Sequence, residues 1–129
     1  MSKRINITTG SPWEDKVGYS RAVQVGNIIE VSGTTATDKE GNIVGVNDLY
    51  LQTKTIIETV KNVLEDMGSS LKHVVRTRIY TTDISRWEEI GKAHGEFFST
   101  IKPATAMVEI SRLVNPDMLV EIEFTAITE

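Results

Sequence analysis

The stretch LVEIEFTAI, residues 119–127, alternates apolar with polar or charged residues near the end of the chain. Successive side chains of a β-strand point to opposite faces of the sheet, so this alternation predicts a strand with two different faces. The apolar face is expected to enter the core and carries Val120, Ile122, Phe124 and Ala126. The other face carries Glu121, Glu123 and Thr125. A sheet containing this strand is therefore expected to be covered by helices on one side only.

Two amphipathic helices can provide this cover. Leu49–Met67 has apolar residues at helical spacing, with Asn47 or Asp48 as its N-terminal cap and Gly68 as a left-handed residue after its end. The second helix is predicted to begin at a capping box, Ser85-Arg86-Trp87-Glu88, and to run to about Ile101 before Pro103 stops it. Its predicted buried residues are Trp87, Ile90, Phe97, Phe98 and Ile101.

The predicted order of elements is β-β-β-α-β-α-β-β. The first three strands include a hairpin, Arg21–Val25 and Ile28–Ser32, joined by Gly26-Asn27. Later strands are expected at Val74–Thr81, about Ala106–Ile110 and about Leu119–Ile127. Two helices on one face of a mixed, mostly antiparallel sheet make a two-layer α+β fold. With this length, residues 1–129 are expected to form one domain.

The second face of the sheet is predicted to be charged. In the strand 74–81, Val75, Thr77 and Ile79 are assigned to the helix-covered face. The opposite face is assigned Tyr80 and Met107 together with charged residues: Arg76, Arg78, Glu109, Glu121 and Glu123. Two interpretations are equally open. The face is either solvated, with cross-strand ion pairs that contribute little to stability, or it is an oligomer interface that encloses the charges.

The composition excludes several classes of function. The 129 residues contain no cysteine, so disulfides, thiolate catalysis and cysteine-bound metal centres are excluded. A net charge of −4 without a basic cluster argues against nucleic acid as a partner. No segment has the length and hydrophobicity of a signal peptide or a membrane span. We therefore expect a cytoplasmic protein with no membrane partner.

Local motifs that indicate catalysis are sparse. No glycine motif of the P-loop or Rossmann type is present. Glu88, Glu89 and His94 lie near one another on the second helix, but one histidine at such spacing favours a polar helix residue over a metal ligand. We predict neither a metal nor a cofactor. Trp13 lies in a polar loop, where it is expected to be buried as a clip on the core, to cover a pocket or to contact a partner, with the clip favoured.

A set of short segments occurs in a recognisable order along nearly the whole chain, from about Tyr19 to Ile127. The segments are Gly18-Tyr19-Ser20-Arg21-Ala22-Val23, Val31-Ser32-Gly33, Gln52, Val74-Val75-Arg76-Thr77, Thr82-Asp83-Ile84, Phe97-Phe98, Pro103-Ala104, Val108-Glu109-Ile110, Arg112-Leu113 and Val120-Glu121-Ile122-Glu123. In this order they resemble the Rid family, also called the YjgF or L-PSP endoribonuclease-like superfamily.

This resemblance implies a chorismate-mutase-like fold and a homotrimer, with small-molecule sites in the clefts between subunits. The charged sheet face would then point into the trimer. The best-known activity of the family is the hydrolysis of enamines and imines, such as 2-aminoacrylate, to a keto acid and ammonia. In that reaction an arginine after the Pro-Ala pair binds the substrate carboxylate, and a glutamate at the position of Glu121 is the candidate for handling the attacking water.

The sequence departs from the family pattern at the carboxylate-binding position. Thr105 follows Pro103-Ala104 in place of the arginine, and it offers one hydroxyl and no charge. Losing a charge-assisted contact costs about 1.5–3 kcal/mol, so deamination of 2-aminoacrylate is expected to be weak or absent. Thr34 stands in place of a glutamine, and Gly91 and His94 stand in place of an asparagine and a tyrosine. These joint changes indicate a different ligand.

Glu121 is the predicted catalytic residue of this site. Trp13 and Tyr19 are expected as its walls or lid, and the other predicted binding residues are Arg21, Gly33, Thr34, Arg78, His94 and Thr105. Arg21 or Arg78 would supply the missing cation. Both also have purely structural interpretations, Arg21 as an exposed strand residue and Arg78 as a partner in an interface ion pair.

Three functions follow from these predictions. The first is a hydrolase that acts on a small C–N-containing metabolite. The second is a metabolite-binding or regulatory trimer without catalysis, which the missing arginine favours. The third is a ribonuclease, which the acidic charge makes the least favoured.

Overall fold

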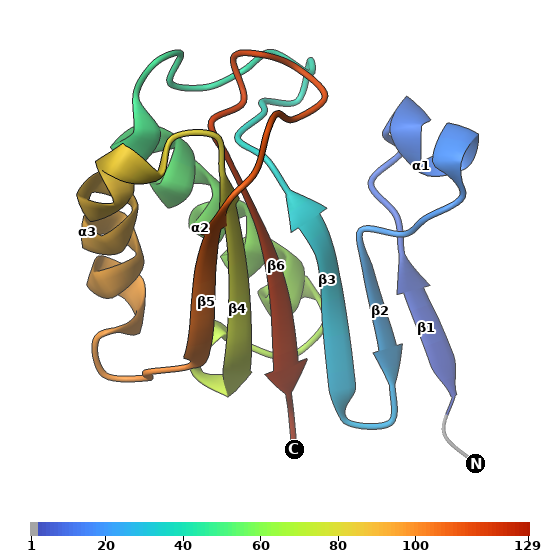
Figure 1. Cartoon of the computed structure of the whole chain (residues 1–129). Coiled ribbons are helices and arrows are strands. Elements are labelled where there is room, and N and C mark those ends of the chain that lie inside the picture. The colour runs from blue at the N-terminus through green and yellow to red at the C-terminus, as the bar shows by residue number, and fades with distance from the viewer. Residues whose placement is uncertain (1–2) are drawn as a thin grey trace.

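The structure is a computed structural model and describes residues 3–129 (Figure 1). Its strands and helices, in chain order, are β1 (Arg4–Ile7), α1 (Pro12–Val17), β2 (Ala22–Val25), β3 (Ile28–Thr34), α2 (Leu49–Asp66), β4 (Val74–Thr81), α3 (Trp87–Phe98), β5 (Ala104–Glu109) and β6 (Val120–Ile127). Short 3₁₀ turns at Leu71–His73 and Ile84–Arg86 precede β4 and α3. The predicted order is confirmed, with the addition of α1, which the sequence pattern did not predict.

Within residues 3–129, six strands form one sheet in the order β1-β2-β3-β6-β4-β5. Neighbouring strands are antiparallel except for β4 and β5, which are parallel. A parallel pair needs a long crossover connection, and α3 provides it between β4 and β5. The prediction of a mixed, mostly antiparallel sheet is therefore confirmed.

The core lies between the sheet and its two longer helices. In Figure 1, α2 passes behind the sheet and α3 lies beside it, next to the β5 edge. The four apolar residues of β6 named above are fully buried, as their alternation predicts. They pack with the apolar stripe of α2, which includes Ile56, Val60 and Leu64. Burial of side chains of this size provides most of the stabilising free energy.

Helix α2 begins at the predicted residue, Leu49, and ends one residue before its predicted limit. Its first turn is capped by Asp48, whose Oδ1 accepts a hydrogen bond from the backbone N–H of Leu51 at 3.0 Å. The helix ends at Asp66, and Gly68 follows with a φ of +79°. A residue without a Cβ adopts this left-handed conformation at no steric cost.

The start of α3 differs from the prediction. The capping box at Ser85 is not formed, because Asp83 lies two residues earlier and its Oδ1 accepts a hydrogen bond from the backbone N–H of Ser85. This contact caps the 3₁₀ turn that leads into the helix. Trp87 is consequently the first residue of α3 and is 54% exposed rather than buried. The helix ends at Phe98, three residues before the predicted limit.

Three residues face differently from their predicted sides. A register irregularity between Val74 and Arg76 turns Val74 into the core, so Val75 is exposed. Met107 pairs with Ile79, and Glu109 pairs with Thr81 in the parallel register of β4 and β5. Because directly paired residues share a face, Met107 and Glu109 lie on the helix-covered side. Alternation fixes which residues share a face, but not which face meets the helices.

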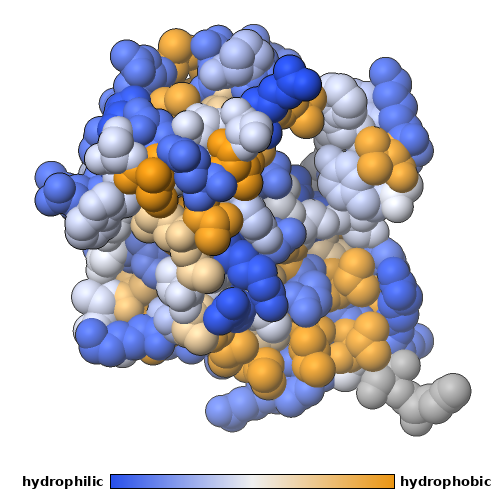
Figure 2. All heavy atoms as spheres, viewed as in Figure 1, coloured by the Kyte–Doolittle hydropathy of each residue, from blue (hydrophilic) through white to orange (hydrophobic). Residues whose placement is uncertain are grey.

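The uncovered sheet face carries an apolar cluster and four of the five predicted charged residues, namely Arg76, Arg78, Glu121 and Glu123. Among residues 3–129, the single ion pair within 4.0 Å joins Arg86 and Glu89, which lie outside this face. The cross-strand ion pairs of the solvated interpretation are therefore not formed. Figure 2 shows apolar side chains gathered low on the molecule, where paired strands bring together Val25, Ile28 and Ile127. Each of these three is more than 40% exposed.

Candidate functional site

A large cavity lies in a cleft between α1 and the loops that follow β3 and β5. Its volume is about 1410 Å³. Figure 2 shows the molecule hollowed at this place, between the part formed by α1 and the main body. Its apolar lining includes Trp13, Val17, Val114 and Met118, and its polar lining includes Arg21, Thr34 and Glu121.

Helix α1 is held in place by a buried carboxylate. Glu14 is only 3% exposed, and it accepts hydrogen bonds from the backbone N–H of Thr9 at 3.0 Å and from its hydroxyl at 2.6 Å. Gly18 ends the helix with a φ of +87°, which favours glycine. This anchoring leaves Trp13 55% exposed on the cleft, so the favoured expectation that it is buried as a clip is wrong.

The floor of the cleft is formed by neighbouring strands. Arg21 precedes β2, and its Nη2 donates to the backbone carbonyl of Gly33 in β3 at 2.7 Å. Glu121 of β6 lies over the same glycine: a Cβ added to Gly33 would stand 2.7 Å from Glu121 Oε2. Thr34 is buried beside it and donates to the carbonyl of Ser32. The strand order β2-β3-β6 brings these residues together from distant parts of the sequence.

Burial shifts the pKa values of both charged groups at this floor. The pKa of Glu121 is raised, first by burial and then by the charge of Glu123, while Arg21 opposes the shift. The pKa of Arg21 is lowered by burial. Its Nε is shielded from solvent and has no hydrogen-bond partner among the described residues. A buried donor without a partner is costly, so the guanidinium is not fully satisfied within the described residues.

A second polar group lies on the helix-covered side of the sheet. Thr77 of β4 places its Oγ1 3.0 Å from Nε2 of His94 and 2.8 Å from Oγ1 of Thr105. His94 comes from α3 and Thr105 from the edge strand β5. Burial lowers the pKa of His94. The parallel register pairs Thr77 with Thr105, which is why their hydroxyls meet.

The predicted site residues thus fall into separate places. Six of them line the cleft: Trp13, Tyr19, Arg21, Gly33, Thr34 and Glu121. His94 and Thr105 lie together on the helix-covered side. Arg78 pairs with Glu123 in the strand register and belongs to the uncovered face, outside the lining of the cleft. In one chain, the pairing of Glu121 with Tyr80 places Glu121 on that uncovered face, opposite Thr105.

Sequence reasoning missed residues that these two places depend on. The alternation places Thr77 on the core face and assigns it no role, although a buried threonine hydroxyl requires a partner. Glu14 was not singled out, and nothing in its local sequence shows that it is buried. Val114 and Met118 belong to a loop whose position is decided by tertiary contacts.

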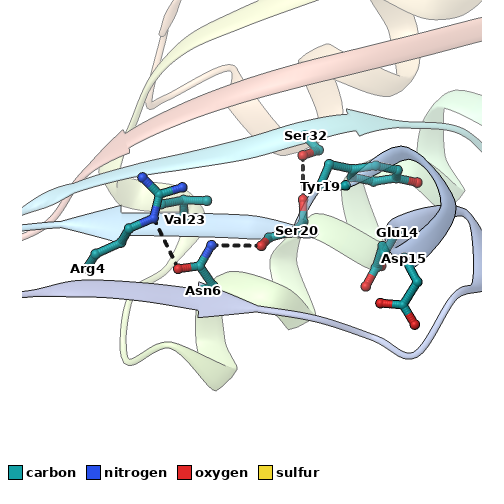
Figure 3. Close-up of a pocket in the computed structure, with 9 residues that line it drawn as sticks. Arg4, Asn6, Glu14, Asp15, Tyr19, Ser20, Val23 and Ser32 are labelled. Carbon is teal, nitrogen blue, oxygen red and sulfur yellow. Dashed lines mark hydrogen bonds between the residues drawn. The ribbon is translucent and has the colours of Figure 1, made fainter.

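A smaller cavity of about 460 Å³ adjoins the cleft beneath α1. Figure 3 shows its polar lining, in which Asn6 joins Arg4 to Ser20 through hydrogen bonds. Ser32 Oγ donates to the carbonyl of Ser20 at 2.6 Å. Tyr19 lines both cavities, so the two share one side chain.

Two searches of the described residues concern other classes of site. Residues 3–129 contain no group of three or more histidine, aspartate or glutamate residues placed to hold a metal ion. Within the same residues, no helix combines the length and the apolar character that crossing a membrane requires.

The sequence and the fold both resemble those of known proteins. Residues 11–128 match the family described as Endoribonuclease L-PSP. A RutC family protein of Pyrococcus abyssi is 37% identical over the full length of both chains. The 3-aminoacrylate deaminase RutC of Acinetobacter baylyi is 34% identical over 98% of each chain. A solved Mycobacterium tuberculosis protein of the YjgF/YER057c/UK114 family is 42% identical with a TM-score of 0.88, covering 98% of this chain and 100% of its own.

These matches settle the class of the protein. The two-layer α+β fold is that of the YjgF structures, as the TM-score shows. The chain belongs to the Endoribonuclease L-PSP family, within the Rid/YjgF superfamily that its ordered segments resemble.

Proposed function

We propose that the protein is a small-molecule hydrolase of the enamine and imine deaminase type, with a specificity different from that of 2-aminoacrylate deaminases. The observation that carries this proposal is the carboxylate of Glu121, half-buried in the cleft beside Gly33 and Arg21. Its raised pKa brings it closer to the pH at which a general base works efficiently. The 34% identity to a 3-aminoacrylate deaminase supports the same reaction class.

The proposed reaction uses water as the nucleophile. Glu121 accepts a proton from water, and the oxygen of that water attacks the carbon of the C–N bond. The C–N bond then breaks, and nitrogen leaves as ammonia after protonation. Arg21 lines the same cleft, so its guanidinium is the proposed contact for a polar atom of the ligand near the attacked carbon.

A homotrimer is part of this proposal. In one chain Glu121 and Thr105 lie on opposite faces of the sheet, so a single small ligand cannot reach both. A cleft between subunits would join the Glu121 floor of one chain to the Thr105 edge of another. The uncovered sheet face supports association, because it exposes apolar side chains and carries charges that form no ion pair among residues 3–129.

Ammonia release across a panel of imines, enamines and small amides tests the proposal. On any substrate that is turned over, Glu121→Gln is expected to lower kcat by about 10²-fold or more, the usual contribution of a general base. An unchanged rate would remove Glu121 as the base. Glu40→Gln changes an exposed carboxylate elsewhere on the cleft and is the matched control. Sedimentation of the full chain at micromolar concentration tests the trimer, and a monomer would contradict the intersubunit site.

A non-catalytic metabolite-binding trimer is the alternative. The observation that favours it is Thr105, which supplies no charge where deaminases of this family bind a carboxylate. A metabolite that raises the melting temperature and is never turned over would support it, whereas rapid turnover of the same metabolite would exclude it. Ribonuclease activity remains the least favoured function, because the net charge is −4.

A further inference from the structure

Two buried threonines of β4 differ in what their hydroxyls contact. Thr77 and Thr81 lie four residues apart on the same face, and both are fully buried. Thr81 Oγ1 donates to the backbone carbonyl of Leu119 at 2.8 Å, which satisfies the hydroxyl. Thr77 Oγ1 instead contacts two side chains, His94 and Thr105. The Thr81 contact is structural, whereas the two Thr77 contacts connect the titratable ring of His94 to the exposed hydroxyl of Thr105.

The direction of the hydrogen bonds around Thr77 follows from the carbonyl of Pro103, at which this series of hydrogen bonds ends. Thr105 Oγ1 donates to the carbonyl of Pro103 at 3.1 Å, and a carbonyl can only accept. Each threonine hydroxyl has one proton, so Thr77 donates to Thr105, and Nε2–H of His94 donates to Thr77. The chain of donors thus runs from a half-buried imidazole to a hydroxyl exposed on the edge strand β5.

We propose that this chain is a proton relay through which His94 acts as the acid for an uncharged ligand group bound at Thr105. It rests on the proposed function, because it names the residue that protonates the substrate of that hydrolase. A ligand oxygen or nitrogen replaces the Pro103 carbonyl as acceptor. His94 Nε2 gives its proton to Thr77, Thr77 gives its own to Thr105, and Thr105 gives its own to the ligand. The imidazolium becomes a neutral imidazole that keeps its proton on Nδ1, and Nε2 is reprotonated from solvent before the next turnover.

The surroundings of His94 favour an uncharged ligand over an ionic one. The ring packs against Phe98, with ring centres 4.7 Å apart. The charged residues Lys92 and Glu96 on the same helix interact with Tyr50 of α2. Burial, and no charged neighbour, is the cause of the lowered pKa of His94. The imidazolium is therefore a minor species at neutral pH and a stronger acid than an exposed one.

The position of Thr105 leads to the same ligand class. Arg76 and Arg78 are its nearest arginines along β4, and both belong to the opposite face of the sheet. A carboxylate at Thr105 would receive one neutral hydrogen bond from this chain in place of a charge-assisted pair. An imine nitrogen or an amide carbonyl oxygen loses less on leaving water than a carboxylate does, and it can accept the same proton.

The relay is tested by NMR titration of His94 in the full chain, without a substrate. Thr77→Val removes the acceptor of the His94 Nε2–H. The midpoint of the His94 titration is therefore expected to fall, and the tautomer of the ring is expected to change. Thr105→Val alters no contact of the ring, yet it is expected to lower the midpoint by a smaller amount, because Thr77 loses its own acceptor. Thr77→Ser should retain the wild-type midpoint. Thr81→Val is the matched buried control, and His73 is the internal reference.

The outcomes separate a relay from a structural contact. A Thr105→Val protein in which the His94 midpoint and tautomer equal those of the wild type overturns the relay. Thr105 is exposed, so this variant keeps the test valid even where Thr77→Val fails to fold. If the relay is wrong, the His94 titration does not respond to the change at Thr105. If the proposed function is wrong, no substrate releases ammonia.

The ligand class is tested with acetamide and acetate, which have nearly the same shape. Acetamide is expected to shift the NMR signals of the Thr105 methyl group and of the His94 ring, and acetate to leave them unchanged. Thr105→Val should abolish the shift of the His94 ring. Absence of a shift with acetamide, or a larger shift with acetate, overturns the assignment of an uncharged group.

Discussion

Gly33 lies directly beneath the carboxylate of Glu121, so that a Cβ on Gly33 would stand 2.7 Å from Oε2 and 2.9 Å from Cδ. Such contacts are shorter than real Cβ atoms show. The reason for a glycine here is close approach rather than a left-handed backbone. The same residue accepts the hydrogen bond of Arg21 through its carbonyl, so it holds the relative positions of the two charged groups in the cleft.

Gly33→Ala is therefore expected to displace the carboxylate of Glu121 and to lower the free energy of unfolding only slightly, because the atoms that must move are the end of a flexible side chain. Gly95→Ala in α3 is the matched control, because its added Cβ meets nothing within 4 Å. That change should stabilise the helix by about 0.5–1 kcal/mol. Urea unfolding measures both, and equal effects of the two variants would contradict the close contact.

The raised pKa of Glu121 makes stability depend on pH in a definite direction. The folded protein binds this proton more tightly than the unfolded chain, whose carboxyl has the ordinary pKa of 4.5. The contribution of Glu121 to the free energy of unfolding thus decreases as pH rises from 4.5 through the folded-state pKa. Glu121→Gln should exceed wild type in stability at neutral pH and equal it in acid. Parallel curves of stability against pH would show that burial does not shift this group.

The N-terminal cap of α2 can be tested separately from its charge. Asp48→Ala removes the acceptor of the Leu51 N–H and is expected to cost about 1 kcal/mol. Asp48→Asn keeps a capping oxygen and should cost much less. Chemical unfolding compares the two variants. An equal loss in both would show that the charge of Asp48 contributes, rather than its hydrogen bond.

The uncovered sheet face is predicted to be buried between subunits. Ile28→Lys places a charge in the apolar cluster with Val25 and Ile127, and it is expected to shift the sedimenting species from trimer to monomer. Val46→Lys changes an apolar residue that is 60% exposed in a loop, and it serves as the control. A trimer that persists in Ile28→Lys would place the interface elsewhere.

Much of the fold could be predicted because its signals are local. The alternation in residues 119–127 gives the buried side of β6, and the spacing of apolar residues gives α2. The errors arose where a competing local contact decided the outcome. Asp83 capped the turn before α3 in place of Ser85, and a register irregularity exposed Val75.

The candidate site was predicted only in part, for a related reason. Resemblance indicated six residues that the strand order gathers in one cleft, among them Arg21 and Glu121. It gave no indication that His94 and Thr105 meet through Thr77, because the parallel pairing of β4 and β5 brings those two hydroxyls together. Their roles in catalysis and binding remain predictions.

The sequence by itself determined the class of fold, the order of its elements and the two faces of β6, since period and capping act over a few residues. Tertiary structure alone decided that Glu121 lies on Gly33 and that His94 reaches Thr105 through Thr77. These contacts join residues that are far apart along the chain. Their geometry depends on the register between strands, which no local pattern specifies.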